Sequence, residues 1–291
     1  MAFIKDEVYL GTIDEYNYLL SLIANYAQPE KWTFGALKEI DPYKILRNYF
    51  EHTYERISEE NKFVFSEDNN FKCMNTGLIT TYNQDVYAVF IRNKRSSGLP
   101  WKFSRVYKDT DTFIRSNFSS MPQIADYFDT VEDLIYDKNL KIELNINHII
   151  DDNYQRFADI GYLDKSLINA LLISAKLILE KRLLRNYKLA LPFYYSNTQT
   201  KESKMQLLVP IYFPASPVRL ALVLDKQTGA DGSKYYEGIT VLPVEWAYMN
   251  SRLIVKPDDE WVKLIDELDT IPEINNSADN IKGYEMIFET P

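Results

Sequence analysis

The sequence predicts an α+β fold, with mostly antiparallel sheets packed on a buried central helix and flanked by further helices. Long segments with apolar residues every three or four positions predict the helices. Short segments with alternating apolar residues predict the strands, and the short connections between them favour antiparallel pairing. Apolar residues make up 46% of the 291 residues, which is enough for a sizeable core.

In the N-terminal half, helical spacing predicts one helix over 14–27 and a second from Pro42 onward. Four strands are expected between residues 62 and 107, where the apolar period changes to two. A helix is expected over 124–136, and an extended segment over 140–150.

The strongest helical pattern covers residues 166–186 and is apolar on most sides as far as Leu179, so this is the expected buried central helix. Four more strands are then expected, with a hairpin tip at 229–232. These strands should cover residues 189–195, 205–213, 219–224 and 235–241. A helix beginning at Pro243 and a short helix over 257–268 complete the pattern.

Three regions are expected: an N-terminal helical extension over 1–29, an α+β core over 30–262 and an acidic C-terminal tail over 263–291. Residues 258–291 hold ten acidic and two basic residues, a net charge of −8, whereas the whole chain carries −9. The rest of the chain is therefore nearly neutral, with basic zones at 92–115 and 176–188. The tail could fold over the basic body and compete with an anionic ligand.

Composition excludes several classes of protein. One cysteine, Cys73, allows no internal disulfide, and two histidines with one cysteine cannot build a Cys/His zinc site. The motifs of P-loop NTPases, dinucleotide-binding enzymes, serine hydrolases and zinc proteases are absent. We therefore expect no cofactor and no metal.

The most apolar stretch, near 167–184, contains too many charges to cross a bilayer. The N-terminal residues lack the basic segment followed by an apolar run that marks a secretory signal. These observations favour a cytoplasmic protein with no membrane partner.

Polar side chains inside apolar, strand-like segments are the strongest functional signal, because buried polar groups need partners. His148 is the candidate catalytic residue, since histidine moves protons near neutral pH. Asp151 and Asp152 could hold a divalent cation. The alternative is a strand-end histidine capped by a polar turn, with both aspartates in solvent.

The other candidates suit an anionic, base-containing ligand. Lys188 could bind phosphate or only cap a helix end, and Gln206 could read a base edge or bridge two backbones. Arg252 could bind phosphate or pair with a carboxylate across the core. The tyrosines could stack on bases or hydrogen-bond. The complete ligand-binding set is Arg156, Asn186, Lys188, Tyr194, Tyr195, Gln206, Tyr248, Asn250 and Arg252.

Several motifs together resemble the domain of unknown function family 3825, in the same order over about residues 30–262. They include Asn75-Thr-Gly-Leu78, Asn186-Tyr-Lys-x-Ala-x-Pro-x-Tyr-Tyr195, Gln206-Leu-Leu-x-Pro210, Leu220-Ala-Leu222 and Ala247-Tyr-x-Asn-x-Arg-Leu253. The chain differs at Arg219, where the family pattern has an acid, and at Ser251, where alanine is usual. The resemblance implies an association with RNA-handling modules.

The functional expectation is therefore binding of RNA or a nucleotide-containing ligand in a basic, aromatic pocket. One alternative is a phosphodiesterase or nucleotide-processing enzyme that uses His148 as general acid or base. Another is a protein-interaction subunit of a defence or regulatory complex, with a protein partner or a second copy of the chain.

Overall fold

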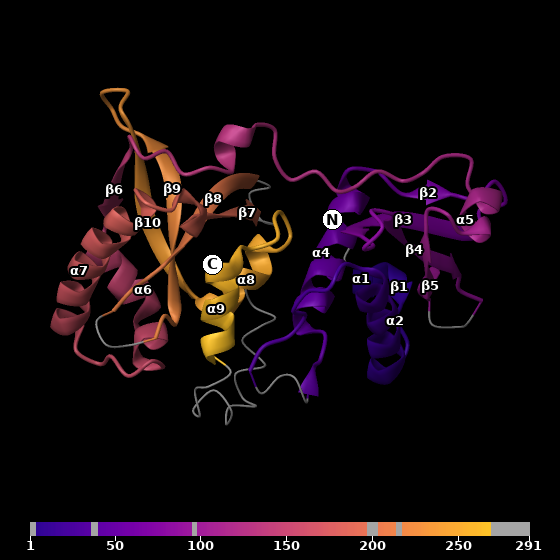
Figure 1. Cartoon of the computed structure of the whole chain (residues 1–291), viewed down its shortest axis with the longest axis horizontal. Helices are drawn as coiled ribbons and strands as arrows, with labels where there is room; N and C mark the ends of the chain where they lie inside the picture. Colours follow the sequence, from indigo (N-terminus) through magenta and orange to yellow (C-terminus); the bar gives the residue numbers. More distant parts are fainter. Residues whose placement is uncertain (1–3, 36–39, 95–97, 197–202, 214–216, 269–291) are drawn as a thin grey trace. The chain divides into compact units, whose positions relative to one another are not determined.

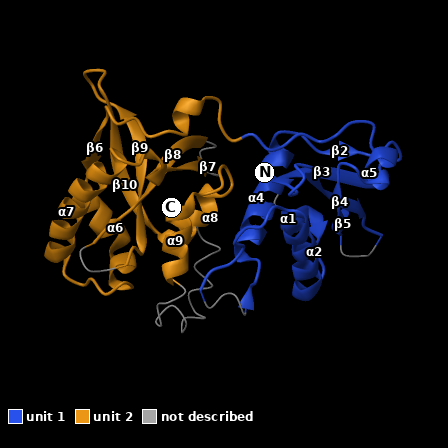
Figure 2. Ribbon diagram, viewed as in Figure 1, with its two compact units in different colours: residues 1–126 blue, residues 127–291 orange. Residues whose placement is uncertain are grey.

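The structure is a computed structural model that describes residues 4–35, 40–94, 98–196, 203–213 and 217–268. The chain divides into two compact units, residues 1–126 and 127–291 (Figure 2). Each unit contains one five-stranded, mostly antiparallel sheet with helices packed against it (Figure 1). The predicted α+β class is confirmed.

The sheet of unit 1 contains the four strands expected between residues 62 and 107, with a short N-terminal strand added in parallel at one edge. Its order is β1 (Val8–Tyr9), β5 (Trp101–Lys108), β4 (Asp85–Arg92), β3 (Phe71–Ile79) and β2 (Val64–Phe65).

Helices cover both faces of this sheet. Helix α4 (Lys44–Glu59) packs Phe50 on Phe103 and Tyr54 on Phe90, and α2 (Ile13–Tyr26) lies beside it along β5. The short α5 (Thr112–Asn117) covers part of the other face.

The N-terminal helix α1 (Ile4–Glu7) is tied to the sheet through a buried lysine. The Lys72 ammonium lies 3.8 Å from the centre of the Phe63 ring and donates to Tyr54 Oη at 2.6 Å and Glu7 Oε2 at 3.1 Å. Burial lowers the pKa of Lys72. Burial opposes ionisation of Glu7, but the bonds from Tyr54 and Lys72 outweigh it and lower the pKa of that carboxyl.

The sheet of unit 2 confirms the four strands expected between residues 189 and 241. Its order is β6 (Lys141–Leu144), β10 (Lys234–Pro243), β9 (Leu220–Thr228), β8 (Ser203–Pro210) and β7 (Leu191–Ser196). Strand β6 pairs in parallel with β10 over Tyr235–Gly238, and the other pairs are antiparallel. The β9–β10 hairpin turns at 229–232, as expected.

In unit 2, α6 (Ile146–Ala158) and α7 (Lys165–Leu183) pack on one face of the sheet, and α8 (Val244–Ser251) crosses the other face, with α9 (Asp259–Leu268) beside it (Figure 1). Leu207 and Val209 of β8 point into the core with α6 and α7. Because successive strand residues point to opposite faces, Gln206 and Leu208 point toward the α8 side.

The expectation of a buried central helix is wrong. Ile168, Leu172 and Leu179 of α7 are buried against the sheet. Leu167, Ile173 and Leu177 on its other side remain 48%, 50% and 56% exposed. The helix therefore packs through one face only, although both faces are apolar.

Two local predictions are also wrong. Residues 124–136 form an irregular segment with one 3-10 turn, Val131–Asp133, because their apolar residues are mostly exposed and only Tyr127 and Tyr136 are anchored on the sheet of unit 2. The extended segment expected over 140–150 ends at Leu144. Asn145 then caps α6, and His148 lies in its first turn.

The expected acidic tail begins inside α9, and its residues 269–291 lie outside the described part of the chain. The N-terminal extension expected over 1–29 contains α1, β1 and α2. Across the described residues, we find no helix long and apolar enough to cross a membrane.

Candidate functional site

The candidate residues fall in three places within unit 2. The first is the α8 side of the sheet, the second is helix α6, and the third is the connection between α7 and β7. Tyr195, Gln206, Tyr248, Asn250 and Arg252 belong to the first, His148 and Arg156 to the second, and Asn186 and Lys188 to the third. Tyr194 packs edge-on against Tyr127 and points away from the face that carries Tyr195.

The α8 side of the sheet gathers most of the buried polar residues of unit 2. Helix α8 begins after Pro243, where the Val244 amide donates to the Arg219 carbonyl oxygen at 3.0 Å. It contacts β7, β8, β9 and β10. We call this place the α8 site. It comprises Gln206, Asp225, Asn250, Ser251 and Arg252, with Tyr195 and Lys204 at its rim.

Three polar side chains of the α8 site are buried. Gln206 is 2% exposed, Asn250 is 5% exposed and Ser251 is 0% exposed. Among the described residues, the buried Ser251 hydroxyl has no hydrogen-bond partner. A buried polar group without a partner costs about 1–3 kcal/mol. The Ser251 hydroxyl therefore points to a partner outside the described residues.

The charged residues of the α8 site lie next to Gln206. In the register of β8 and β9, Leu207 pairs with Leu224. The next position along both strands therefore places Asp225 beside Gln206. The buried Asp225 carboxylate accepts hydrogen bonds from the half-exposed Lys204 and, at 2.8 Å, from Gln227. Tyr195 is paired directly with Lys204, so a half-exposed ring lies beside this cation.

A titratable carboxyl stands at the start of α8. Burial raises the pKa of Glu245 to about 7, although the charge of Arg219 acts to lower it. This end of α8 therefore contains a group that changes charge close to neutral pH.

The His148 side chain is exposed in the first turn of α6, and its Nδ1 lies 3.3 Å from Asp152 Oδ2. Asp151 instead pairs with Lys165 at 2.7 Å. The two aspartates therefore have separate partners. Within the described residues, no group of His, Cys, Asp and Glu side chains could hold a metal ion.

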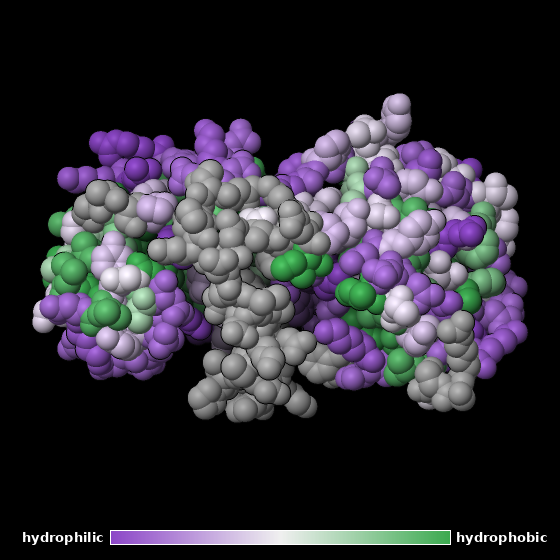
Figure 3. All heavy atoms as spheres, turned by 90° about the horizontal axis from the view of Figure 1, so that it is seen from below, coloured by the Kyte–Doolittle hydropathy of each residue, from purple (hydrophilic) through white to green (hydrophobic). Residues whose placement is uncertain are grey.

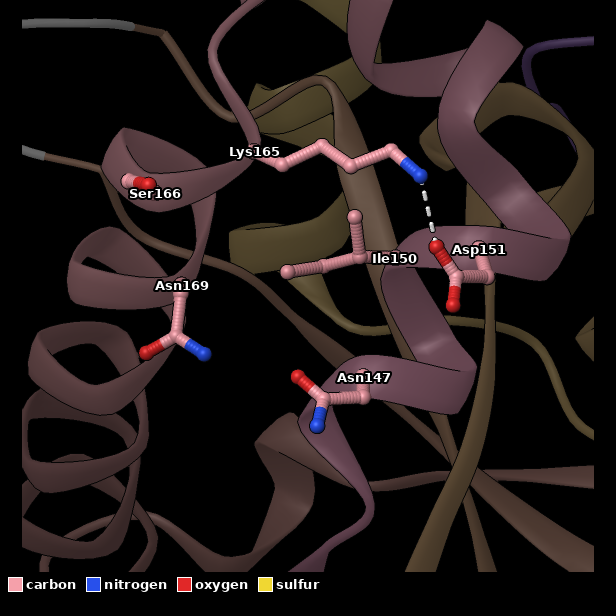
Figure 4. Close-up of a pocket in the computed structure, with 6 residues that line it drawn as sticks. All are labelled: Asn147, Ile150, Asp151, Lys165, Ser166 and Asn169. Carbon is pink, nitrogen blue, oxygen red and sulfur yellow. Dashed lines mark hydrogen bonds and ion pairs between the residues drawn. The ribbon is translucent and has the colours of Figure 1, made fainter.

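A polar hollow lies between α6 and α7 (Figure 4), with a volume of about 370 Å³. In Figure 4 the Lys165 side chain extends to Asp151. Ile150, Asn147 and Asn169 face the space between the two helices. Its lining residues are Asn147, Ile150, Asp151, Lys165, Ser166 and Asn169. The sequence contains no signal for this hollow, because it depends on how two helices cross.

Arg156 holds α6 on the sheet. Its Nη1 donates to Asn153 Oδ1 at 2.5 Å, to the Val241 carbonyl oxygen and, weakly, to Thr240 Oγ1 at 3.4 Å. Burial lowers the pKa of this guanidinium. Because β6 ends at Leu144, Arg156 occupies the edge of β10 that β6 does not reach.

The connection between α7 and β7 is basic. Asn186 caps the 3-10 turn Tyr187–Leu189, and its Nδ2 donates to Glu260 Oε2 at 2.9 Å. Lys188 and the Tyr187 ring are exposed. The Arg182 guanidinium lies 3.9 Å from the centre of the Tyr212 ring. The local cations are Lys181, Arg182, Arg185 and Lys188.

A family model described as Domain of unknown function (DUF3825) matches residues 23–261. The chain belongs to this family. The DUF3825 match includes parts of both units, and it begins inside α2, somewhat before the start expected from the motifs. It ends at Trp261 of α9, whose indole nitrogen donates to the Leu189 carbonyl oxygen at 3.0 Å. No curated protein and no solved structure matches the chain.

Three of the motifs that carry the DUF3825 resemblance contribute to the α8 site, through Tyr195, Gln206 and the Asn250–Arg252 segment. Sequence reasoning missed Asp225 and Lys204. Asp225 ends the apolar run of β9, so the rule that selected Gln206 also applies to it. Lys204 gave no such signal, because a lysine at a strand end is ordinarily solvent-exposed.

Proposed function

We propose that the chain binds RNA or another nucleotide-containing ligand at the α8 site. The observation that carries the proposal is the set of buried polar side chains Gln206, Asn250 and Ser251, of which the Ser251 hydroxyl has no hydrogen-bond partner among the described residues. A ligand with matching donors and acceptors would satisfy them, which is the arrangement found in specific small-molecule sites.

The chemistry of the site suits a nucleotide. Amide side chains present a donor and an acceptor together, the pattern that base edges also present. The half-exposed Tyr195 ring at the rim offers a stacking surface. Lys204 and Arg252 supply positive charge for phosphate, and Asp225 supplies an acceptor for a base or ribose hydrogen.

The test replaces each amide by an apolar side chain of similar shape, as Gln206→Met and Asn250→Leu in the full chain. Binding is measured with fluorescein-labelled random-sequence single-stranded RNA and with the four nucleoside monophosphates. We expect each variant to weaken binding of at least one probe by about tenfold, because a lost hydrogen bond to a buried group costs about 1–3 kcal/mol.

Stability measurements separate a ligand role from a structural one. If the amides serve only a ligand, the apolar variants should keep or raise the thermal midpoint of the unbound protein, since they replace a buried polar side chain by an apolar one. Gln155→Met, at an exposed position of α6, is the matched control and should leave affinity unchanged. Failure of the wild-type chain to bind either kind of probe, or full affinity in both variants, contradicts the proposal.

The second candidate function is phosphodiester or nucleotide processing with His148 as general acid or base. It is favoured by the His148–Asp152 pair on α6, the helix that also lines the polar hollow. The RNA probe tests it in the same experiment. Cleavage that is lost in His148→Ala supports this function, and an intact probe after prolonged incubation argues against it.

A further inference from the structure

Helix α7 exposes an apolar stripe on the side that faces away from the sheet. The exposed residues of the stripe recur at helical spacing. Two of them flank the helix, and the others lie within it. The residues of the stripe are Leu163, Leu167, Ala170, Ile173, Leu177 and Leu184. Figure 3 shows apolar residues gathered at the left of that view, in the part of unit 2 that contains α7.

The stripe is not needed for the core of unit 2. The opposite face of α7 already supplies five residues to that core, Ile168, Leu172, Ala175, Leu179 and Leu183. Single exposed apolar residues are ordinary, but a continuous stripe about 28 Å long marks an interaction surface. The shape of the stripe suits another helix, because its positions follow one side of α7 with few interruptions.

The charges at the two ends of α7 determine which direction a partner helix would take. Asp159 and Asp164 lie at the N-terminal end, where Lys165 is paired with Asp151. Lys181, Arg182 and Arg185 lie at the C-terminal end and outnumber Glu180 there. A second α7 in antiparallel orientation brings acidic and basic ends together at both ends of the contact. A parallel partner would bring like charges together.

The stripe is also self-complementary. If the axis of a two-fold lies between Ile173 and Ser174, Leu163 meets Leu184 of the second copy and Ala170 meets Leu177. Leu167 then lies level with Glu180 of the second copy, between its Leu177 and Leu184. The pairing places the small Ala170 opposite Leu177, and the two-fold repeats each contact on both sides of the axis. Such an arrangement is isologous, the commonest symmetry of protein dimers.

We propose that a second copy of this chain covers the stripe, through antiparallel packing of α7 on α7. The proposal is independent of ligand binding at the α8 site, which lies on the other face of the sheet.

The first experiment measures the molar mass of the full chain by light scattering and sedimentation over a concentration series. The wild type should form a dimer, and the double variant Ile173→Glu/Leu177→Glu should be a monomer, because two charges would be buried in the contact. Ile13→Glu, at an exposed isoleucine of α2, should remain dimeric. Circular dichroism confirms that each variant is folded. A wild type that is monomeric at every concentration, or a folded double variant that is still dimeric, overturns the proposal.

The second experiment tests the orientation with introduced cysteines, since the native Cys73 is buried. A mixture of Ala170→Cys and Leu177→Cys chains should form a disulfide-linked heterodimer under mild oxidation. Ala170→Cys alone should not, because antiparallel helices would separate its two copies by about 10 Å, beyond disulfide reach. Efficient linking of Ala170→Cys to itself would instead indicate parallel helices and contradict the proposed pairing.

Discussion

Glu245 combines burial with a position beside a cation. Its pKa of about 7 in the folded chain lies above the ordinary glutamate value of 4.5, and burial is the main cause. Below the unfolded pKa the carboxyl is protonated in both states and costs nothing. As pH rises through the folded pKa, it must ionise in a place that disfavours charge, so stability is lost between about pH 4.5 and pH 7.

Replacement of Glu245 by glutamine should remove this loss. At pH values above 7, we expect Glu245→Gln to raise the free energy of unfolding by about 2–3 kcal/mol, with little change near pH 4. Urea unfolding at a series of pH values measures it. Glu143→Gln, at an exposed position of β6, is the control. Parallel pH profiles for the wild type and Glu245→Gln would show that the carboxyl is already solvated.

At this scale the sequence identified polar residues well but not their surroundings. Gln206 and Asn250 could be selected because an amide inside an apolar segment is costly, and both are buried. Arg156 and Asn186 were selected by the same argument, yet both have partners within the chain. Whether a buried polar group has an internal partner depends on contacts between distant segments, which no local pattern contains.

Among the elements, periodicity predicted most strands and helices, but not which faces are covered. Helix α7 was expected to be the buried central helix because its sequence is apolar on most sides as far as Leu179. Periodicity also predicted a helix over 124–136, where most of the apolar residues other than Tyr127 and Tyr136 remain exposed. An apolar pattern permits burial, and only a neighbouring element provides it.

Arg156 should be more important for stability than an ordinary surface arginine, because it joins α6 to β10. Arg156→Met removes the donor to Asn153 and to the Val241 carbonyl, and we expect a loss of about 2 kcal/mol. Arg185→Met, at an exposed position near the end of α7, should change stability by less than about 0.5 kcal/mol. Chemical denaturation measures both, and equal effects would contradict the structural role of Arg156.

In the whole molecule, residues 1–126 and 127–291 form two compact units, and the α+β core expected over 30–262 includes parts of both. The family match includes parts of both units, so the motifs do not reveal the division. The boundary between the two units lies within residues 124–136. The sequence predicted a helix there, whereas the segment is an irregular connection with one 3-10 turn.

Separate units should unfold as separate thermal transitions. Leu20→Ala in unit 1 and Leu222→Ala in unit 2 each remove a buried leucine, at a cost of about 2–5 kcal/mol. We expect differential scanning calorimetry to show that each substitution lowers the transition of its own unit and leaves the other in place. A single transition that responds equally to both would show that the units unfold together.

The short length of β6 has a consequence for aggregation of the chain at high protein concentration. Beyond Gly238, part of the β10 edge has no neighbouring strand among the residues that the structure describes, and the Arg156 side chain donates to a carbonyl there. Open strand edges template pairing between molecules, and a charged side chain placed against them discourages it. Loss of Arg156 should therefore make the chain prone to aggregation even under conditions in which it still folds.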